Sequence, residues 1–237
     1  MMKKRLYALL LLFLCCAEAS AASISLLLKG GYVPELGGSM HSSWQAENLG
    51  VMDGINDINR SGGGINVSSI EAPVGFVAGL DARLAGSTFY LKSGVRYVKS
   101  VSGGSGSTLN DFGSGVEKVD VTYSVWFVHV PVTAGIIYNF WDEAKIYLGG
   151  GTGFAYGVYS NSFSSASAEH SARFAGYAAP LVAELGCEYI LGSSVFINCG
   201  LTYIYGKSDV VEDDGDYGRI DFTCYSFTAG IGVYFDI

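Results

Sequence analysis

The segment from residue 122 to residue 140 repeats its side-chain character with a period of two, the period of a β-strand. One face is apolar throughout and carries Trp126, Val128, Val130, Val132, Ala134, Ile136, Tyr138 and Phe140. An alternation this long exceeds the usual strand of a soluble protein. It therefore predicts a long strand in a β-structure that has two chemically different faces.

Seven further segments show strand character, at about 23–34, 72–84, 89–99, 145–158, 173–190, 195–206 and 220–237. The connections between the eight predicted strands alternate between short ones (85–88, 141–144, 191–194) and long ones (35–70, 100–117, 160–172, 207–219), the long ones rich in Gly, Ser, Asn and Asp. Bacterial outer-membrane barrels combine an even strand number, tight periplasmic turns and longer extracellular loops. The pattern predicts an all-β fold, an eight-stranded antiparallel up-and-down transmembrane β-barrel, with both termini in the periplasm.

A soluble barrel or sandwich is the alternative, and it would turn its apolar face inward. The face opposite the apolar one holds glycines and many polar groups, namely Lys29, Asp81, Arg83, Lys92, Arg96, His129, Glu184, Glu188 and Asn198. A soluble core buries so many ionisable groups only at high cost, whereas a polar lumen inside a lipid-facing band accommodates them. This favours the membrane barrel and makes these residues candidates for a charge network in the lumen.

The N-terminus has the pattern of a cleaved signal peptide, with basic residues at 3–5, an apolar run at 6–16 and small residues at 19–22. The run is shorter than the ~20 apolar residues of a membrane-spanning helix. We therefore expect a signal peptide at residues 1–22, a barrel domain at residues 23–237 and a location in the bacterial outer membrane. Lipidation at Cys15 or Cys16 is an alternative, although Leu14 and Cys15 are poor matches to the small residue that this processing prefers.

Short motifs support the same architecture. The segment 127–132, followed by residues 138–140 and, after a turn, residues 146–151, resembles the turn-and-return signature of small porin-like outer-membrane barrels of the OmpW, OmpX and OmpA-barrel type. Residues 30–34 also resemble the first strand of OmpW-type barrels. Gly232, Phe235 and Ile237 resemble the C-terminal assembly signal of this class, with Ile in place of the usual Phe or Trp. The resemblance implies outer-membrane lipid and the barrel-assembly machinery as partners.

The remaining groups give no signature of catalysis, of a metal site or of a cofactor. Glu184 and Glu188 lie roughly 13 Å apart if they share a strand, farther than the paired carboxylates of glycosidases at ~6.5–9.5 Å. His41 and His170 are accompanied by no Gly-x-Ser-x-Gly motif, and the acidic run at 209–216 lacks the spacing of a calcium loop. The net charge of −8 argues against nucleic acid as a partner.

Three cysteines remain once the signal peptide is removed: Cys187, Cys199 and Cys224. Cys187 and Cys199 flank the predicted turn at 191–194 and share the outward face, so they are expected to lie opposite each other. A free pair and a disulfide both remain open. Cys224 is expected to point inward.

Two functions are compatible with these features. The first is a narrow channel or permeability protein for small solutes, since an eight-stranded barrel has an interior that side chains or one small ligand fill. The resemblance to OmpW-type barrels implies that the solutes are small and hydrophobic. The second is a surface protein that contacts a host through its long loops, with a largely plugged lumen.

Counting residues from the short turns places Lys92 and Arg96 across the lumen from Glu188 and Glu184. We therefore expect the pairs Lys92–Glu188 and Arg96–Glu184, which either solvate one another or form a gate.

Overall fold

The computed structural model describes residues 23–36, 74–109, 116–165, 169–209, 211–213, 216–218 and 220–236. The predicted signal peptide and most of the predicted first loop lie outside these residues. The strands are β1 (Ser23–Leu36), β2 (Val74–Ala85), β3 (Phe89–Leu109), β4 (Val116–Asn139), β5 (Ala144–Ser165), β6 (Glu169–Ala178), β7 (Leu181–Leu191), β8 (Val195–Tyr205), β9 (Val211–Asp213), β10 (Asp216–Gly218) and β11 (Cys224–Asp236).

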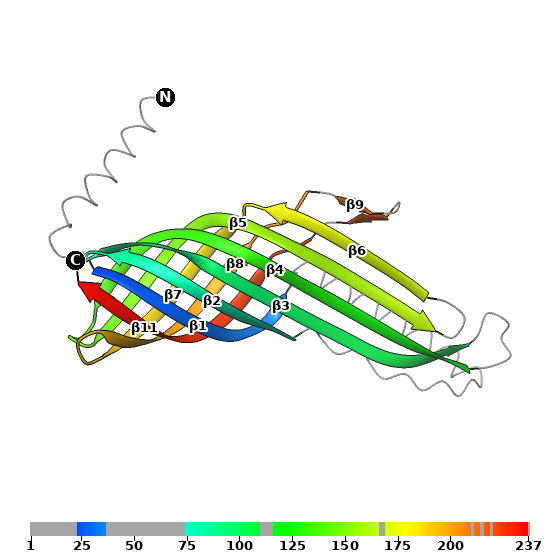
Figure 1. Ribbon diagram of the computed structural model, residues 1–237, viewed down its shortest axis with the longest axis horizontal. Helices are drawn as coiled ribbons and strands as arrows, with labels where there is room; N and C mark the ends of the chain where they lie inside the picture. The colour runs from blue at the N-terminus through cyan, green and yellow to red at the C-terminus, as the bar shows by residue number, and fades with distance from the viewer. Residues whose placement is uncertain are drawn as a thin grey trace, which may run out of the picture.

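The strands form a closed antiparallel barrel (Figure 1). The sheet runs in the order β4-β3-β2-β1-β11-β8-β7-β5, and the pairing of β4 with β5 closes the ring. The first and last strands meet along a continuous ladder from Ser23↔Asp236 to Tyr32↔Phe227. The predicted eight-stranded barrel fold is confirmed.

The sixth predicted strand, 173–190, is divided into β6 and β7 at Ala179 and Pro180. β5 pairs with β7 along its first half, up to Thr152↔Leu181, and with β6 along its second half, from Ala155↔Ala178 onward. Proline has no backbone N–H to donate, so the ladder breaks where Pro180 stands. The two pieces therefore occupy one position in the barrel wall at different heights.

The three short turns, the beginning of β1 and the end of β11 lie at the same end of the barrel (Figure 1). Hydrogen bonds join two of these turns to neighbouring strands, from Ile190 N of β7 to the Glu143 carbonyl at 2.7 Å and from Tyr234 N of β11 to the Ser194 carbonyl at 2.7 Å. Gly192 takes a φ of 80° in the β7–β8 turn, a conformation that other residues rarely adopt. We call this the turn end.

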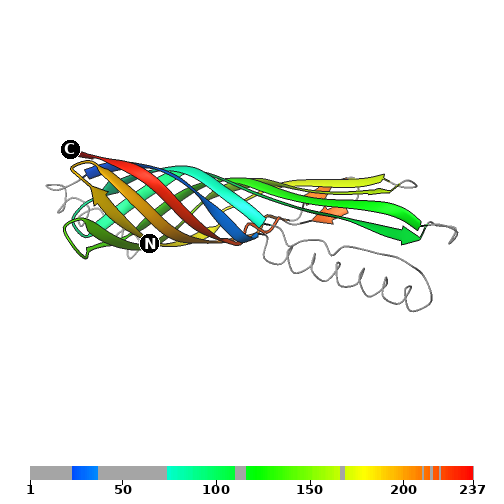
Figure 2. The ribbon, with the colours of Figure 1, turned by 90° about the horizontal axis from the view of Figure 1, so that it is seen from below.

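At the opposite end, β3, β4, β5 and β6 continue beyond the barrel as a projecting sheet (Figures 1 and 2). The β3–β4 ladder runs to Leu109↔Val116 and the β5–β6 ladder to Ser164↔Glu169. The prediction of loops at 100–117 and 160–172 was therefore wrong over most of their length. Their Gly, Ser and Asn content is typical of loops, but each pair of neighbouring strands continues its ladder through it.

The outer face of the barrel is apolar over most of its height. Exposed aromatic and aliphatic side chains cover it, among them Leu28, Phe76, Leu80, Val95, Val132, Tyr138, Trp141, Leu148, Tyr177, Leu185, Phe227 and Ile231. Within the described residues, no helix is long and apolar enough to cross a membrane.

Candidate functional site

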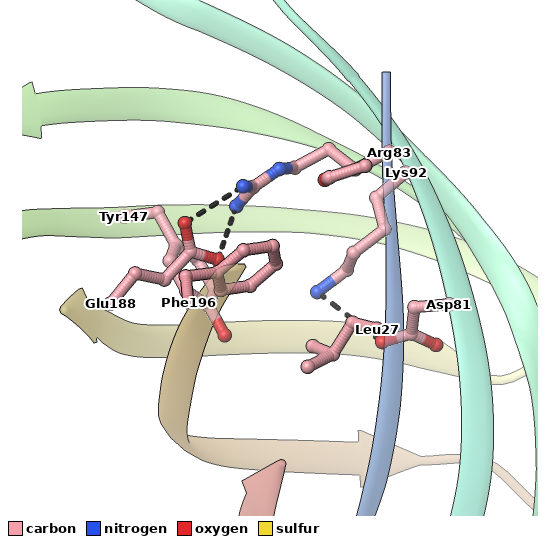
Figure 3. Close-up of a pocket in the computed structure, with 8 residues that line it drawn as sticks. Leu27, Asp81, Arg83, Lys92, Tyr147, Glu188 and Phe196 are labelled. Carbon is pink, nitrogen blue, oxygen red and sulfur yellow. Dashed lines mark hydrogen bonds and ion pairs between the residues drawn. The ribbon is translucent and has the colours of Figure 1, made fainter. Parts of the chain in front are cut away.

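Two charged layers fill the barrel interior above the turn end. In the first, Arg83 of β2 reaches Glu188 of β7 with both terminal nitrogens, each donating at 2.7 Å to a different carboxylate oxygen (Figure 3). The Tyr234 hydroxyl donates to the same carboxylate at 2.7 Å, and Asn198 Nδ2 donates at 3.3 Å. The planar guanidinium matches the carboxylate, so this is a strong and directional pair.

The second layer lies farther from the turn end and has Asp81 as one of its two anions. Lys29 Nζ lies 2.5 Å from Asp81 Oδ2, and Arg96 Nη2 lies 3.3 Å from the same oxygen. Lys92 Nζ is 3.8 Å away. One carboxylate on β2 therefore holds cations from β1 and β3.

Glu184 of β7 is the other anion of the second layer and faces β3 and β4 across the lumen. Its carboxylate pairs with Lys92 and, at 3.5 Å, with Arg96 Nη2. The hydroxyls of Tyr90 and Thr133 each donate to Glu184 Oε1 at 2.8 Å. The residue is only 3% exposed. A buried carboxylate with two cations and two hydroxyl donors is well compensated.

The predicted pair of Arg96 and Glu184 is present, whereas the predicted pair of Lys92 and Glu188 was wrong. Arg83 stands opposite Lys92 in the β2–β3 register and takes Glu188 instead. Lys92 turns to the higher Glu184 and to Asp81. Counting residues from the turns ignores the tilt and stagger of barrel strands, which shift side-chain heights between distant strands.

His129 was a candidate for the charge network, and the structure places it in the lumen without a hydrogen bond to that network. Its side chain is completely buried in the lumen, opposite Arg96 in the β3–β4 register. Neither ring nitrogen has a hydrogen-bond partner among the described residues. His129 therefore lines the lumen outside the ion-pair network.

Glycines make room for the aromatic side chains that cross the lumen. A Cβ at Gly149 would collide with the Tyr90 hydroxyl, and a Cβ at Gly186 would collide with the Tyr147 ring. The two tyrosine rings meet edge to face at 5.8 Å between centroids. Glycines on β5 and β7 thus allow large lumen side chains to approach the barrel wall closely.

An apolar cluster closes the lumen above the charged layers, and we call it the mouth cluster. It consists of Val33, Leu36, Val77, Val98, Phe127, Ala155, Ile204, Ile220, Phe222 and Cys224. Ile220 and Phe222 are completely buried although they precede β11, and the Phe222 ring meets Phe127 at 5.3 Å between centroids. Residues 220–223, the inserted segment, therefore fold into the mouth of the barrel.

Backbone hydrogen bonds hold the inserted segment to the residues that follow β8. Ser208 N donates to the Ile220 carbonyl at 2.9 Å, and Phe222 N donates to the Gly206 carbonyl at 2.8 Å. Lys207 Nζ lies 3.3 Å from the Asp221 carboxylate. The segment is thus fixed to the barrel rim on one side.

A cavity of about 10 Å³ lies between the charged layers, lined in part by Arg83, Lys92, Glu188 and Phe196 (Figure 3). This is room for about one water molecule. Ion pairs and the mouth cluster thus cross the lumen at different heights.

The other predicted sites lie apart from the lumen network. Gly232 is buried against the Phe196 ring, Phe235 points outward at the turn end, and Ile237 lies outside the described residues. In the described part of the chain, no three His, Cys, Asp or Glu residues are arranged to hold a metal ion.

Sequence analysis missed the inserted segment and the phenols of Tyr90, Tyr147 and Tyr234. The phenols could have been found, because each stands at an inward position of a predicted strand. The inserted segment could not, because Ile220 and Phe222 read as the beginning of the last strand.

A closed antiparallel barrel with an apolar outer face and a charged interior defines the class of small outer-membrane β-barrels. Its outer face contacts the lipid of the bacterial outer membrane. The family model described as Leptospira porin protein OmpL1 matches residues 56–189, more than half of the chain. The chain belongs to this family. A comparison with curated proteins finds no match.

Several solved structures are similar to the chain. Ail, the attachment invasion locus protein of Yersinia pestis, is 16% identical, with 90% of this chain and 97% of that chain covered and a TM-score of 0.36. The outer membrane protein OprG from Pseudomonas aeruginosa is 11% identical, with 92% and 97% covered and a TM-score of 0.42. The outer membrane protein AlkL is 14% identical, with 91% and 90% covered and a TM-score of 0.38. Likenesses this distant say nothing of the chain's activity.

Proposed function

We propose that this protein is a narrow channel for small solutes that rests in a closed state. The observation that carries the proposal is the ion-pair network across the lumen, in which Lys92 and Arg96 of β3 meet Glu184 of β7. Membership of a porin family supports a permeability role. A permanently sealed barrel could fill its interior with apolar side chains at less cost than with buried charges.

Opening requires two changes along the barrel axis. Ile220 and Phe222 leave the mouth, and the bonds of Glu184 to β3 are exchanged for bonds to water or solute. The inserted segment is the element suited to the first change, since it precedes β11 and its backbone is hydrogen-bonded to residues 206–208 at the barrel rim. A solute that passes must be small, because the wall itself is a closed ladder.

The lumen charges favour anions over cations. The buried mid-barrel groups among the described residues are four cations, Lys29, Arg83, Lys92 and Arg96, and three anions, Asp81, Glu184 and Glu188. Once the ion pairs separate, the one excess positive charge favours the passage of anions, as rings of charged side chains set ion selectivity in other pores. Small hydrophobic solutes are compatible with the mouth cluster but not with the charged layers in their present arrangement.

Orientation follows from the same proposal. Residues 1–22 act as a cleaved signal peptide, both termini and the turn end face the periplasm, and the projecting sheet stands outside the cell. Gly232, Phe235 and Ile237 form the signal that the barrel-assembly machinery reads.

The experiment is conductance of the purified full-length barrel in planar bilayers. We expect small, rare openings for the wild type and more frequent openings for the Ile220→Ser, Phe222→Ser double variant. Phe76→Ser, an outward position of similar size, is the control and leaves the frequency unchanged. Silence of both proteins in correctly folded form would contradict the channel.

A second candidate function is binding to a host surface through the projecting sheet. β3 continues eight residues beyond its last pair with β2, from Val101 to Leu109, which spans about 26 Å. A barrel needs no such extension to cross the membrane. Replacing residues 103–122 with a short turn tests this function, because it should abolish adhesion of bacteria to host cell monolayers and leave conductance unchanged. Unchanged adhesion would contradict the surface role.

A further inference from the structure

Cys187 of β7 and Cys199 of β8 are direct partners in the ladder of one hairpin. Both side chains point outward, and both thiols are free in the structure. Residues directly opposite each other on antiparallel strands have Cα atoms ~4.5–5.5 Å apart. A disulfide accepts Cα separations of ~4.4–6.8 Å. The backbone of the hairpin therefore needs no movement for the two sulfurs to bond.

We infer that Cys187 and Cys199 are a modification site at which the β7–β8 hairpin is closed by a disulfide bond. The surroundings fit a covalent bond better than a metal or a catalytic thiol. Ile146 flanks Cys187 on β5, and Ala229 flanks Cys199 on β11. No third metal-ligating side chain joins them in the described part of the chain.

The timing follows from the same apolar surroundings. Thiol–disulfide exchange needs a thiolate that the oxidant can reach, and a lipid-facing side chain is out of reach of a water-soluble oxidant. The bond therefore forms while the hairpin is still in the aqueous periplasm, an oxidising compartment. A gap of eleven residues between the two cysteines keeps them close even before the barrel closes.

The oxidant is the disulfide of a periplasmic thiol oxidoreductase. One cysteine thiolate attacks that disulfide and forms a mixed disulfide, releasing one oxidoreductase thiolate. The thiolate of the second cysteine then attacks the sulfur of the first cysteine and releases the second thiolate of the oxidoreductase. The hairpin loses two protons and two electrons, and the oxidoreductase disulfide becomes a dithiol.

The bond would secure the register on which the charged lumen depends. Glu188 and Asn198 stand next to the cysteines on the opposite face and are themselves ladder partners, joined by a hydrogen bond of 3.3 Å. A slip of one residue would turn Glu188 outward, away from Arg83. The covalent bond prevents that slip.

The chain offers a direct test. No Lys or Arg lies between Arg173 and Lys207, so trypsin releases residues 174–207 as one peptide with both cysteines, while Cys224 is on another peptide. Cells exporting the full chain are acid-quenched, the denatured protein is alkylated with iodoacetamide without reduction, and the peptide is weighed. We expect most of it to carry no alkyl group and to be lighter by two hydrogen atoms than the reduced peptide. Prior reduction should then allow two alkyl groups.

Matched variants separate the proposal from general oxidation. Cys224→Ser should leave peptide 174–207 unchanged, and Cys187→Ser should leave one alkylated thiol at Cys199. Recovery of more than half of the wild-type peptide with two alkyl groups before reduction would overturn the proposal. So would linkage of this peptide to Cys224 or to a second copy of the chain.

Discussion

Arg83 on β2 and Glu188 on β7 form a two-pronged ion pair across the lumen, with both bonds at 2.7 Å. The two strands are separated in the sheet by several others, so the pair ties opposite parts of the wall together. It forms the layer nearest the turn end, and the pairs of Asp81 and Glu184 form the next. Stability and closure of the barrel therefore depend on the same charged groups.

Breaking the first layer from one side should destabilise the barrel strongly. Glu188→Ala leaves Arg83 buried without its carboxylate and should lower the free energy of unfolding by about 3–5 kcal/mol. The measurement is the temperature at which the band of folded protein disappears from a gel, which should fall. Glu143→Ala removes an exposed carboxylate from the β4–β5 turn and should change stability by at most ~0.5 kcal/mol. The double variant Arg83→Met, Glu188→Leu should recover most of the loss; a double variant as unstable as Glu188→Ala would contradict this assignment.

A larger residue at Gly186 should prevent normal packing of the lumen. The side chain of Gly186→Val would collide with the Tyr147 ring, and such overpacking costs roughly 1–3 kcal/mol or more. Gly30→Ala is the control, because its Cβ would meet nothing closer than 3.7 Å. Yields of folded barrel in refolding assays measure the difference, and equal yields would mean that Tyr147 does not occupy this position.

The proposed orientation can be tested with single cysteines in a chain lacking Cys187, Cys199 and Cys224. Ser162→Cys places a thiol on the projecting sheet, and Asp142→Cys places one in a short turn, both at exposed positions. On intact cells a membrane-impermeant maleimide should label the first and spare the second until the envelope is opened. The reverse pattern would invert the topology.

The ion preference should depend on the single excess cation. Lys29→Met removes one of the partners of Asp81 and leaves Arg96 and Lys92 in place, so the layer keeps its anion paired. We expect the anion preference of the wild type, read from the reversal potential in a salt gradient, to diminish or vanish in this variant. An unchanged reversal potential would show that these buried charges do not set selectivity.

The fold was predictable from sequence because each strand alternates and each short turn separates two alternations. The inward positions of Lys29, Asp81, Arg96 and Glu184 followed from the same period of two. The partner of Glu188 could not be predicted in this way, because the stagger between strands sets the height of each side chain in the barrel and no local sequence pattern indicates that stagger. The projecting sheet was missed because loops and exposed hairpins share a Gly- and Ser-rich composition, and only pairing between strands distinguishes them.

The most direct measurement of a closed, charge-gated channel is the conductance of charge swaps at Arg96 and Glu184, which lie 3.5 Å apart. Arg96→Glu and Glu184→Arg each place like charges together, and each should raise the frequency of openings in planar bilayers. The double variant restores opposite charges and should return the frequency toward that of the wild type. Independent, additive effects of the two substitutions, or silence of all four folded proteins, would contradict the account.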